Sequence, residues 1–210
     1  MELLFSALGV LPLLVIVLIV FALASVGGRR EPDPTGRRPF AVYLVSVCFV
    51  ALIVLVATLT VVVTYLGQLP LGGSDGDGAA AIQTGLVALI AALVLLFHAQ
   101  RLKGLLAEAT PSENAARTTY LVYLYAVCFV TILAGLTAAA VALFALLRVI
   151  APGVFGGGDL FARNKGLRQL VPTGFLTVAS ALIFAFHWRR AAAVRIAPET
   201  TLPPEAAPPV

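Results

Sequence analysis

Five long apolar segments, with no charge in their interiors, restrict the fold of this chain more than any other feature. A helix needs about 20 residues to cross the hydrocarbon core of a membrane, because each residue adds about 1.5 Å. Backbone groups in lipid must satisfy each other, so a helix is favoured even where Val and Thr are frequent. The sequence therefore predicts an all-α integral membrane protein with five transmembrane helices, near residues 3–26, 40–66, 79–100, 120–148 and 169–189.

The composition supports a membrane protein and argues against a soluble one. Hydrophobic residues make up 60% of the chain and charged residues 11%, with a mean hydropathy of +1.03. The net charge of +4 does not indicate nucleic-acid binding, because the basic residues flank apolar spans and follow the rule for cytoplasmic loops. The excess of Arg over Lys, with abundant Ala, Val, Leu, Gly and Pro, indicates a bacterial protein.

The second and fourth segments carry the same motif, which indicates an internal repeat. Six of eight residues are identical between residues 43–50 and residues 123–130, eighty positions later. A second match aligns the third segment with the fifth and pairs Phe97-His98 with Phe186-His187. Each repeat is therefore a pair of apolar helices.

This repeat defines the predicted domain organisation. We divide the chain into an N-terminal transmembrane anchor (1–27), a cytoplasmic linker (28–39), a first two-helix repeat (40–101), a cytoplasmic loop (102–119), a second two-helix repeat (120–190) and a disordered Pro-rich tail (191–210). Residues 22–24 resemble a signal-peptide cleavage site, but no basic residue precedes the long apolar run, so an uncleaved anchor is favoured. Pro172 is expected in the first turn of the last helix.

The two repeats are expected to form a pseudo-two-fold four-helix bundle, with Cys48 facing Cys128 across its interior. Within each repeat the tyrosine (Tyr43 or Tyr123) and the cysteine are five residues apart, which corresponds to a rotation of about 140° on a helix. They cannot both point in the same direction. We assign the interior to the cysteines and place both tyrosines in the aromatic belt at the membrane surface.

The distribution of basic residues predicts the orientation. With the N-terminus outside, ten basic residues lie on the cytoplasmic side and four lie outside, which agrees with the positive-inside rule. The four outer residues are Arg148, Arg163, Lys165 and Arg168. They are interpreted as interface residues that snorkel at the membrane surface, or alternatively as contacts for lipid phosphates or an acidic partner. The predicted location is a bacterial plasma membrane with a cytoplasmic C-terminus.

His98 and His187 occupy equivalent places near the ends of the third and fifth segments. One interpretation places them at the membrane interface beside Arg and Trp. The alternative is that both ligate one haem, which would make the protein an electron carrier. A zinc site that combines them with Cys48 and Cys128 is disfavoured, because the cysteines lie deeper in the helices than the histidines.

The sequence contains no recognisable catalytic arrangement, and we expect a protein that is not an enzyme. None of the five spans carries Asp, Glu, Lys or Arg in its core, which disfavours ion-coupled transport. The fourth segment has a face of small residues suited to close helix packing, namely Ala134, Gly135, Ala138, Ala139 and Ala142. A scaffold or partner subunit of a membrane complex, in contact with lipid and with a membrane protein, is therefore favoured over a haem carrier or a small-solute transporter.

The repeated Tyr-Leu-x-x-Val-Cys-Phe-Val blocks and the Phe-His-x-x-Arg helix ends extend over residues 37–190. In these motifs the chain resembles bacterial multi-pass membrane proteins of unknown function that are built from duplicated two-helix units. The resemblance implies a fold and does not imply an activity.

Overall fold

A computed structural model describes residues 36–71, 78–107, 114–155 and 160–196, and all regular structure in these ranges is helical. The elements are α2 (Arg37–Gln68), the short 3-10 helix η2 (Leu69–Leu71), α3 (Gly78–Ala107), α4 (Asn114–Ile150), the one-turn α5 (Pro152–Phe155) and α6 (Leu160–Ile196). The expected first helix at residues 3–26 lies outside the described residues. Most of the linker and the tail from residue 197 onward also lie outside them.

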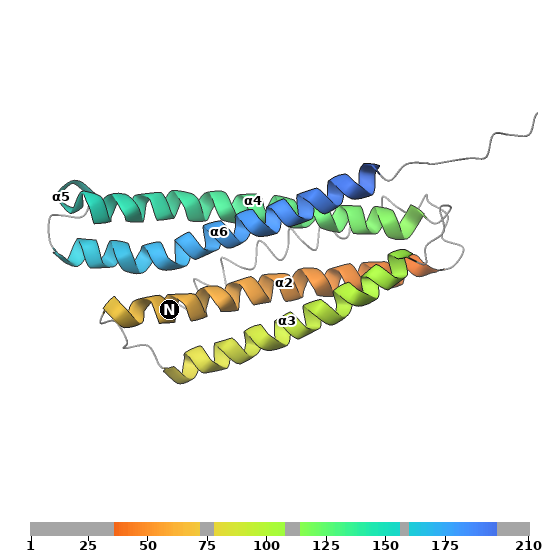
Figure 1. Ribbon diagram of the computed structural model, residues 1–210, viewed down its shortest axis with the longest axis horizontal. Coiled ribbons are helices and arrows are strands. Elements are labelled where there is room, and N and C mark those ends of the chain that lie inside the picture. Colours follow the sequence, from red (N-terminus) through yellow and green to blue (C-terminus); the bar gives the residue numbers. More distant parts are fainter. Residues whose placement is uncertain (1–35, 72–77, 108–113, 156–159, 197–210) are drawn as a thin grey trace, which may run out of the picture.

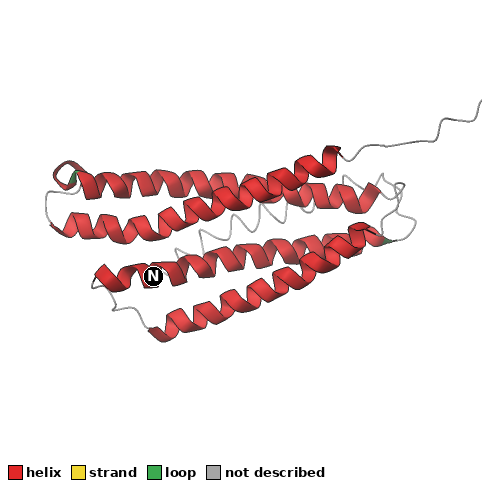
Figure 2. Cartoon of the chain, in the orientation of Figure 1, coloured by secondary structure: helices red, strands yellow, loops and turns green. Residues whose placement is uncertain are grey.

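The long helices form two antiparallel hairpins that lie side by side (Figures 1 and 2). One hairpin consists of α2 and α3, and the other consists of α4 and α6. The hairpins meet mainly through α2, which packs against both α4 and α6. Consequently α2 is the central helix, and α3, whose main contact is with α2, is the most peripheral of the four long helices.

The main core of the bundle lies near the start of α2 and α4. It combines Leu44, Val45, Cys48 and Phe49 of α2 with Tyr120, Tyr123, Leu124 and Val127 of α4, and it includes Leu102 of α3 and Ala191 of α6. The residues of α2 and α4 follow a spacing of three and four, which places them on one side of each helix. Burial of this apolar surface joins the two hairpins.

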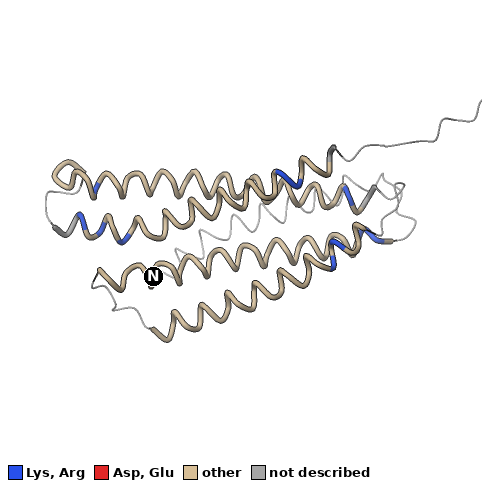
Figure 3. Tube along the Cα trace, in the orientation of Figure 1, with Lys and Arg blue, Asp and Glu red and all other residues tan. Residues whose placement is uncertain are grey.

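Four helices in the described part of the chain are long and apolar enough to cross a membrane, namely Arg37–Leu71, Gly78–Ala107, Ala116–Ile150 and Arg163–Val194. Figure 3 shows Lys and Arg at the two ends of the bundle and uncharged helix middles between them. One end holds the starts of α2 and α4 and the ends of α3 and α6, with Arg37, Arg117, Lys103 and Arg190, and we call it the Lys103 end. We call the other the Arg148 end. This arrangement indicates an integral membrane protein with several spans.

The helices extend further than the hydropathy predicts. The expected loop at residues 102–119 is helical up to residue 107 and again from residue 114, and residues 191–196 of the expected tail belong to α6. α6 also begins at Leu160, so Pro172 lies inside the helix and not in its first turn. Charged residues such as Arg163 are exposed on the helix surface, and charge alone does not end a helix. Helix ends follow the Gly and Pro breakers more closely than they follow the loss of hydrophobicity.

The cysteines and tyrosines agree only in part with the expected faces. Cys48 and Cys128 are buried free thiols, and Tyr43 is 53% exposed, as expected. Tyr123, however, is only 6% exposed, so its placement in an aromatic belt was wrong. The reason is that α4 packs against α2 on one side and α6 on another, which buries two faces of the same helix. The facing of Cys48 and Cys128 across the interior stays a prediction.

Candidate functional site

Each hairpin contains a contact between a tyrosine and a histidine, which we call a Tyr–His pair. In the first hairpin, Oη of Tyr43 lies 3.4 Å from Nε2 of His98. In the second, Oη of Tyr123 lies 3.4 Å from Nε2 of His187. The ring centroids are 5.8 Å apart in both pairs, with interplanar angles of 64° and 69°. The two pairs therefore share one geometry.

A backbone carbonyl group determines which ring nitrogen of each histidine is protonated. Nδ1 of His98 lies 2.8 Å from the carbonyl oxygen of Val94, and Nδ1 of His187 lies 2.8 Å from that of Ile183. A carbonyl oxygen can only accept, so Nδ1 is the protonated nitrogen and donates. In the neutral ring Nε2 is then an acceptor, and the tyrosine hydroxyl donates to it. Both ring nitrogens are thus engaged within the protein.

An aromatic ring and an arginine complete each Tyr–His pair. Phe97 meets His98 edge-on at 5.3 Å between centroids, and Phe186 meets His187 in the same way at 5.3 Å. The guanidinium of Arg101 lies 5.4 Å from the Phe97 ring centroid, and that of Arg190 lies 4.3 Å from the Phe186 ring centroid. These distances allow cation–π attraction, which orients each arginine at the helix end.

The two histidines differ in their surroundings. His187 is 7% exposed and lines a cavity between the hairpins. His98 is half-buried and lines a separate depression on the outer side of the first hairpin, together with Tyr43 and Arg101. The structure therefore does not bring the two imidazoles into one cavity, which a haem held by both would require.

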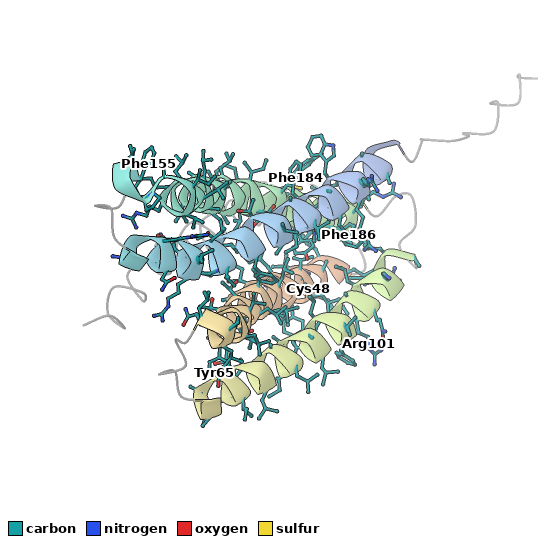
Figure 4. The ribbon with its side chains drawn as sticks, turned by 60° about the vertical axis from the view of Figure 1, so that its left-hand side comes forward. Cys48, Tyr65, Arg101, Phe155, Phe184 and Phe186 are labelled. Atoms are coloured by element: carbon teal, nitrogen blue, oxygen red, sulfur yellow. The ribbon has the colours of Figure 1, made fainter. Side chains whose placement is uncertain are left out.

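The space beside His187 is lined by all four long helices, and we call it the inter-hairpin cavity. Its volume is about 560 Å³, within the range of about 300–1,000 Å³ that is usual for small-molecule sites. Cys48 of α2 and Phe186 of α6 line it from opposite hairpins, and both are labelled in Figure 4. Lys103 and Arg190 also line it, together with Tyr120, Tyr123 and leucines from α2, α3, α4 and α6.

The four basic residues expected at the membrane surface lie together at the Arg148 end. Arg163, Lys165 and Arg168 are exposed on the first part of α6. Arg148 lies 4.6 Å from the Phe144 ring centroid and donates from Nε to the Phe155 carbonyl at 3.4 Å. Arg168 donates to the carbonyl oxygen of Leu71 at 3.5 Å, which links the two hairpins. Arg148 and Arg168 therefore have contacts within the protein.

The small residues of α4 lie partly at its contact with α6. Ala138 is buried, and Ala134, Gly135, Ala139 and Ala142 are half-buried. A Cβ added at Gly135 would lie 3.1 Å from Cβ of Ser180, so the two helices approach closely there. The approach is closer at Gly166 of α6, where an added Cβ would lie 2.9 Å from the Ala145 carbonyl oxygen. The seam between α4 and α6 thus depends on small residues at several levels.

The outer surface of α3 carries a regular row of large apolar side chains, which we call the α3 stripe. It consists of Ile82, Leu86, Leu89, Leu93 and Leu96, each more than half exposed. The spacing alternates between four and three residues, which is the a/d pattern of a helix that packs against another helix. Among the described helices, α3 makes its main contact with α2.

Sequence reasoning singled out the two histidines but missed their tyrosine partners and the cavity beside His187. The signal was present, because Tyr43 and Tyr123 are equivalent positions and lie a few residues from the same end of the bundle as the histidines. Within the described ranges, no group of three His, Cys, Asp or Glu side chains is arranged to hold a metal ion. Comparison of the chain with protein-family models, curated proteins and solved structures found no match.

Proposed function

We propose that this chain is a non-enzymatic scaffold or partner subunit of a membrane complex, and that the α3 stripe is the surface that contacts its partner. Lipid tails are as apolar as leucine, so a leucine-rich surface alone does not drive association in a membrane. The regular spacing of the stripe supports the proposal, because side chains at this spacing can pack as knobs into holes between the side chains of a facing helix. The partner is then a transmembrane helix of another protein with a complementary apolar seam.

The asymmetry between α3 and α6, the second helices of the two hairpins, also supports this surface. In the most hydrophobic stretch of 18 residues of each helix, 33% of the residues of α2 are buried but only 11% of those of α3. α6 has the same low share, yet it makes the most extensive contact in the bundle, with α4. α3 has less contact with the rest of the described chain. It is therefore the long helix with most surface left for a partner.

We further propose that the hairpins are duplicated two-helix units related by a pseudo-two-fold axis, as in the bacterial multi-pass proteins that the sequence resembles. The shared geometry of the Tyr–His pairs supports duplication. The symmetry is incomplete, because α2 packs against α6 more extensively than α3 packs against α4. We place the protein in a bacterial plasma membrane, with the Lys103 end in the cytoplasm.

The haem carrier and the small-solute transporter have less support. His98 and His187 line separate cavities, and Nε2 of each faces a tyrosine hydroxyl. The described ranges contain no Asp or Glu, and their Lys and Arg lie towards the helix ends. The separate histidines do not form the paired ligands that a haem carrier uses. The uncharged helix middles do not form the charged path that ion-coupled transporters use.

Site-specific photocrosslinking in the native membrane tests the partner surface. A photoreactive phenylalanine analogue at Leu89, in the α3 stripe, should give one discrete adduct with another membrane protein. The matched control is Leu136 of α4, which is 65% exposed and outside the stripe. Equal or absent crosslinking at the two positions contradicts the proposal. An adduct of twice the mass of the chain would identify a second copy as the occupant and would also contradict it.

Purification in mild detergent distinguishes the three functions. The scaffold proposal expects a companion protein in fixed stoichiometry. A Soret absorption band that depends on both histidines would favour the haem carrier instead. Solute uptake by liposomes that contain only the purified chain would favour the transporter.

A further inference from the structure

The inter-hairpin cavity has a polar end and an apolar end. Lys103 of α3 and Arg190 of α6 lie at one end of its lining, and Leu95 and Leu182 lie at the other. Eight residues separate the cation from the leucine on each helix, which corresponds to about 12 Å along the helix axis. The cavity thus changes from charged to apolar along the helix axes, as a lipid molecule does along its length.

Among the described residues, both charged side chains at the polar end are positive. Lys103 and Arg190 are both part of the lining, and the described ranges contain no Asp or Glu that could neutralise them. Arg190 is oriented by its contact with the Phe186 ring, which also lines the cavity. Basic pockets between transmembrane helices bind anionic lipid head groups. The occupant that matches this end is therefore an anion.

Two of the polar side chains in the wall, His187 and Tyr123, are engaged with each other. His187 donates from Nδ1 to the Ile183 carbonyl and accepts at Nε2 from Tyr123. These groups do not need a hydrogen-bonding ligand, so discrimination between ligands depends on the two cations. Away from the two cations, the wall consists mainly of aliphatic side chains such as Leu52, which can pack against an acyl chain.

We propose that the inter-hairpin cavity binds one anionic phospholipid of the surrounding membrane. The phosphate lies between Lys103 and Arg190, and one acyl chain runs along Leu95 and Leu182. The site shares Leu96 with the α3 stripe, but it does not include Leu89, the position at which the partner surface is tested. The lipid also fills the space between the two hairpins.

Native mass spectrometry of the full chain in detergent tests the site, with phosphatidylglycerol and phosphatidylcholine of identical acyl chains as probes. The unsubstituted protein should bind one phosphatidylglycerol with clear preference. Each cation is expected to contribute about fivefold in affinity. The K103Q/R190Q variant should therefore bind phosphatidylglycerol about 25-fold more weakly and lose the preference. The matched control is K165Q/R168Q at the Arg148 end, which should retain it.

A second pair of variants tests the apolar part without changing charge. Ala99 lines the cavity, whereas Ala140 is exposed on α4. A99L should reduce phosphatidylglycerol binding several-fold, and A140L should not, provided that both elute as monodisperse, helical protein. Equal binding of the two lipids, a preference that survives K103Q/R190Q, or binding unaffected by A99L would each overturn the proposal. If K103Q/R190Q fails to fold, two other results test the proposal. They are the difference in binding between A99L and A140L and the lipid preference of the unsubstituted protein.

Discussion

The Tyr123 hydroxyl lies 3.4 Å from Nε2 of His187, and the same distance separates the equivalent groups of Tyr43 and His98. The two contacts share their geometry but not their environment. Tyr123 is 6% exposed, whereas Tyr43 is 53% exposed. The chain therefore contains one polar contact in a buried form and in an exposed form, and the exposed form is a control for the buried one.

The first prediction compares the two tyrosines. Tyr123→Phe removes the donor to Nε2 of the buried His187 and leaves that nitrogen unpaired, so the free energy of unfolding should fall by about 1–3 kcal/mol. Tyr43→Phe leaves no fully buried group unpaired, because His98 is only half-buried, and it should change stability by less than about 0.5 kcal/mol. Thermal unfolding in detergent, followed by circular dichroism, measures both. A larger loss for Tyr43→Phe would contradict the assigned burial.

Hydrophobicity predicts the long helices well, because lipid leaves the backbone few alternatives to a helix. It does not predict where the helices end. At α6 the charged residues Arg163, Lys165 and Arg168 are exposed on a helix that begins before them, so their polarity was taken for a loop. Sequence patterns assign hydrophobic and polar residues, whereas the helix end depends on local breakers.

Local periodicity also cannot show which helix becomes central. Tyr123 was expected at the surface because one face of α4 was assigned to the interior, but α2 and α6 cover two different faces. The histidines could be identified from the repeated motif. Their separation into two cavities depends on how the hairpins meet, and no pairwise sequence spacing encodes that arrangement.

The second prediction concerns the seam between α4 and α6. Gly166→Ala places a Cβ 2.9 Å from the Ala145 carbonyl oxygen, so the helices must move apart. We expect a loss of about 1–3 kcal/mol, which is typical of overpacking. The control is Gly174→Ala on the same helix, where no atom lies within 4 Å of the added Cβ. That variant should be stabilised by about 0.5–1 kcal/mol, because alanine loses less backbone entropy than glycine. Unfolding by denaturing detergent measures both.

The opposite ranking of the two glycine variants would contradict the close approach of α4 and α6 at Gly166. Equal destabilisation by both would indicate that α6 tolerates no Cβ at either position. That outcome would mean that the open space around Gly174 is occupied, for example by a partner.

The third prediction concerns the two thiols. Cys48 is 1% exposed and Cys128 is 4% exposed, and both are free. In the folded protein, neither should react with a polar maleimide that carries a polyethylene glycol chain. Both should react after unfolding in dodecyl sulfate, which gives two mass additions on a gel. Modification of either thiol in mild detergent would contradict the burial of that residue.

The last prediction concerns the orientation of the bundle, which we propose from the positive-inside rule. Lys103 and Arg163 are both exposed and lie at opposite ends of the bundle, so they report on opposite sides of the membrane. In a chain whose two native cysteines are replaced by alanine, we introduce Lys103→Cys or Arg163→Cys.

A membrane-impermeant maleimide applied to intact cells should label the Arg163→Cys variant and leave the Lys103→Cys variant unlabelled. Both should be labelled when the membrane is opened by mild detergent, which shows that each thiol can react. Each variant changes one basic residue, and the Lys103 end retains Arg37, Arg38, Arg101, Arg117, Arg189 and Arg190, so the charge difference that directs insertion persists. Labelling of Lys103→Cys alone in intact cells would reverse the orientation. The four basic residues at the Arg148 end would then lie in the cytoplasm.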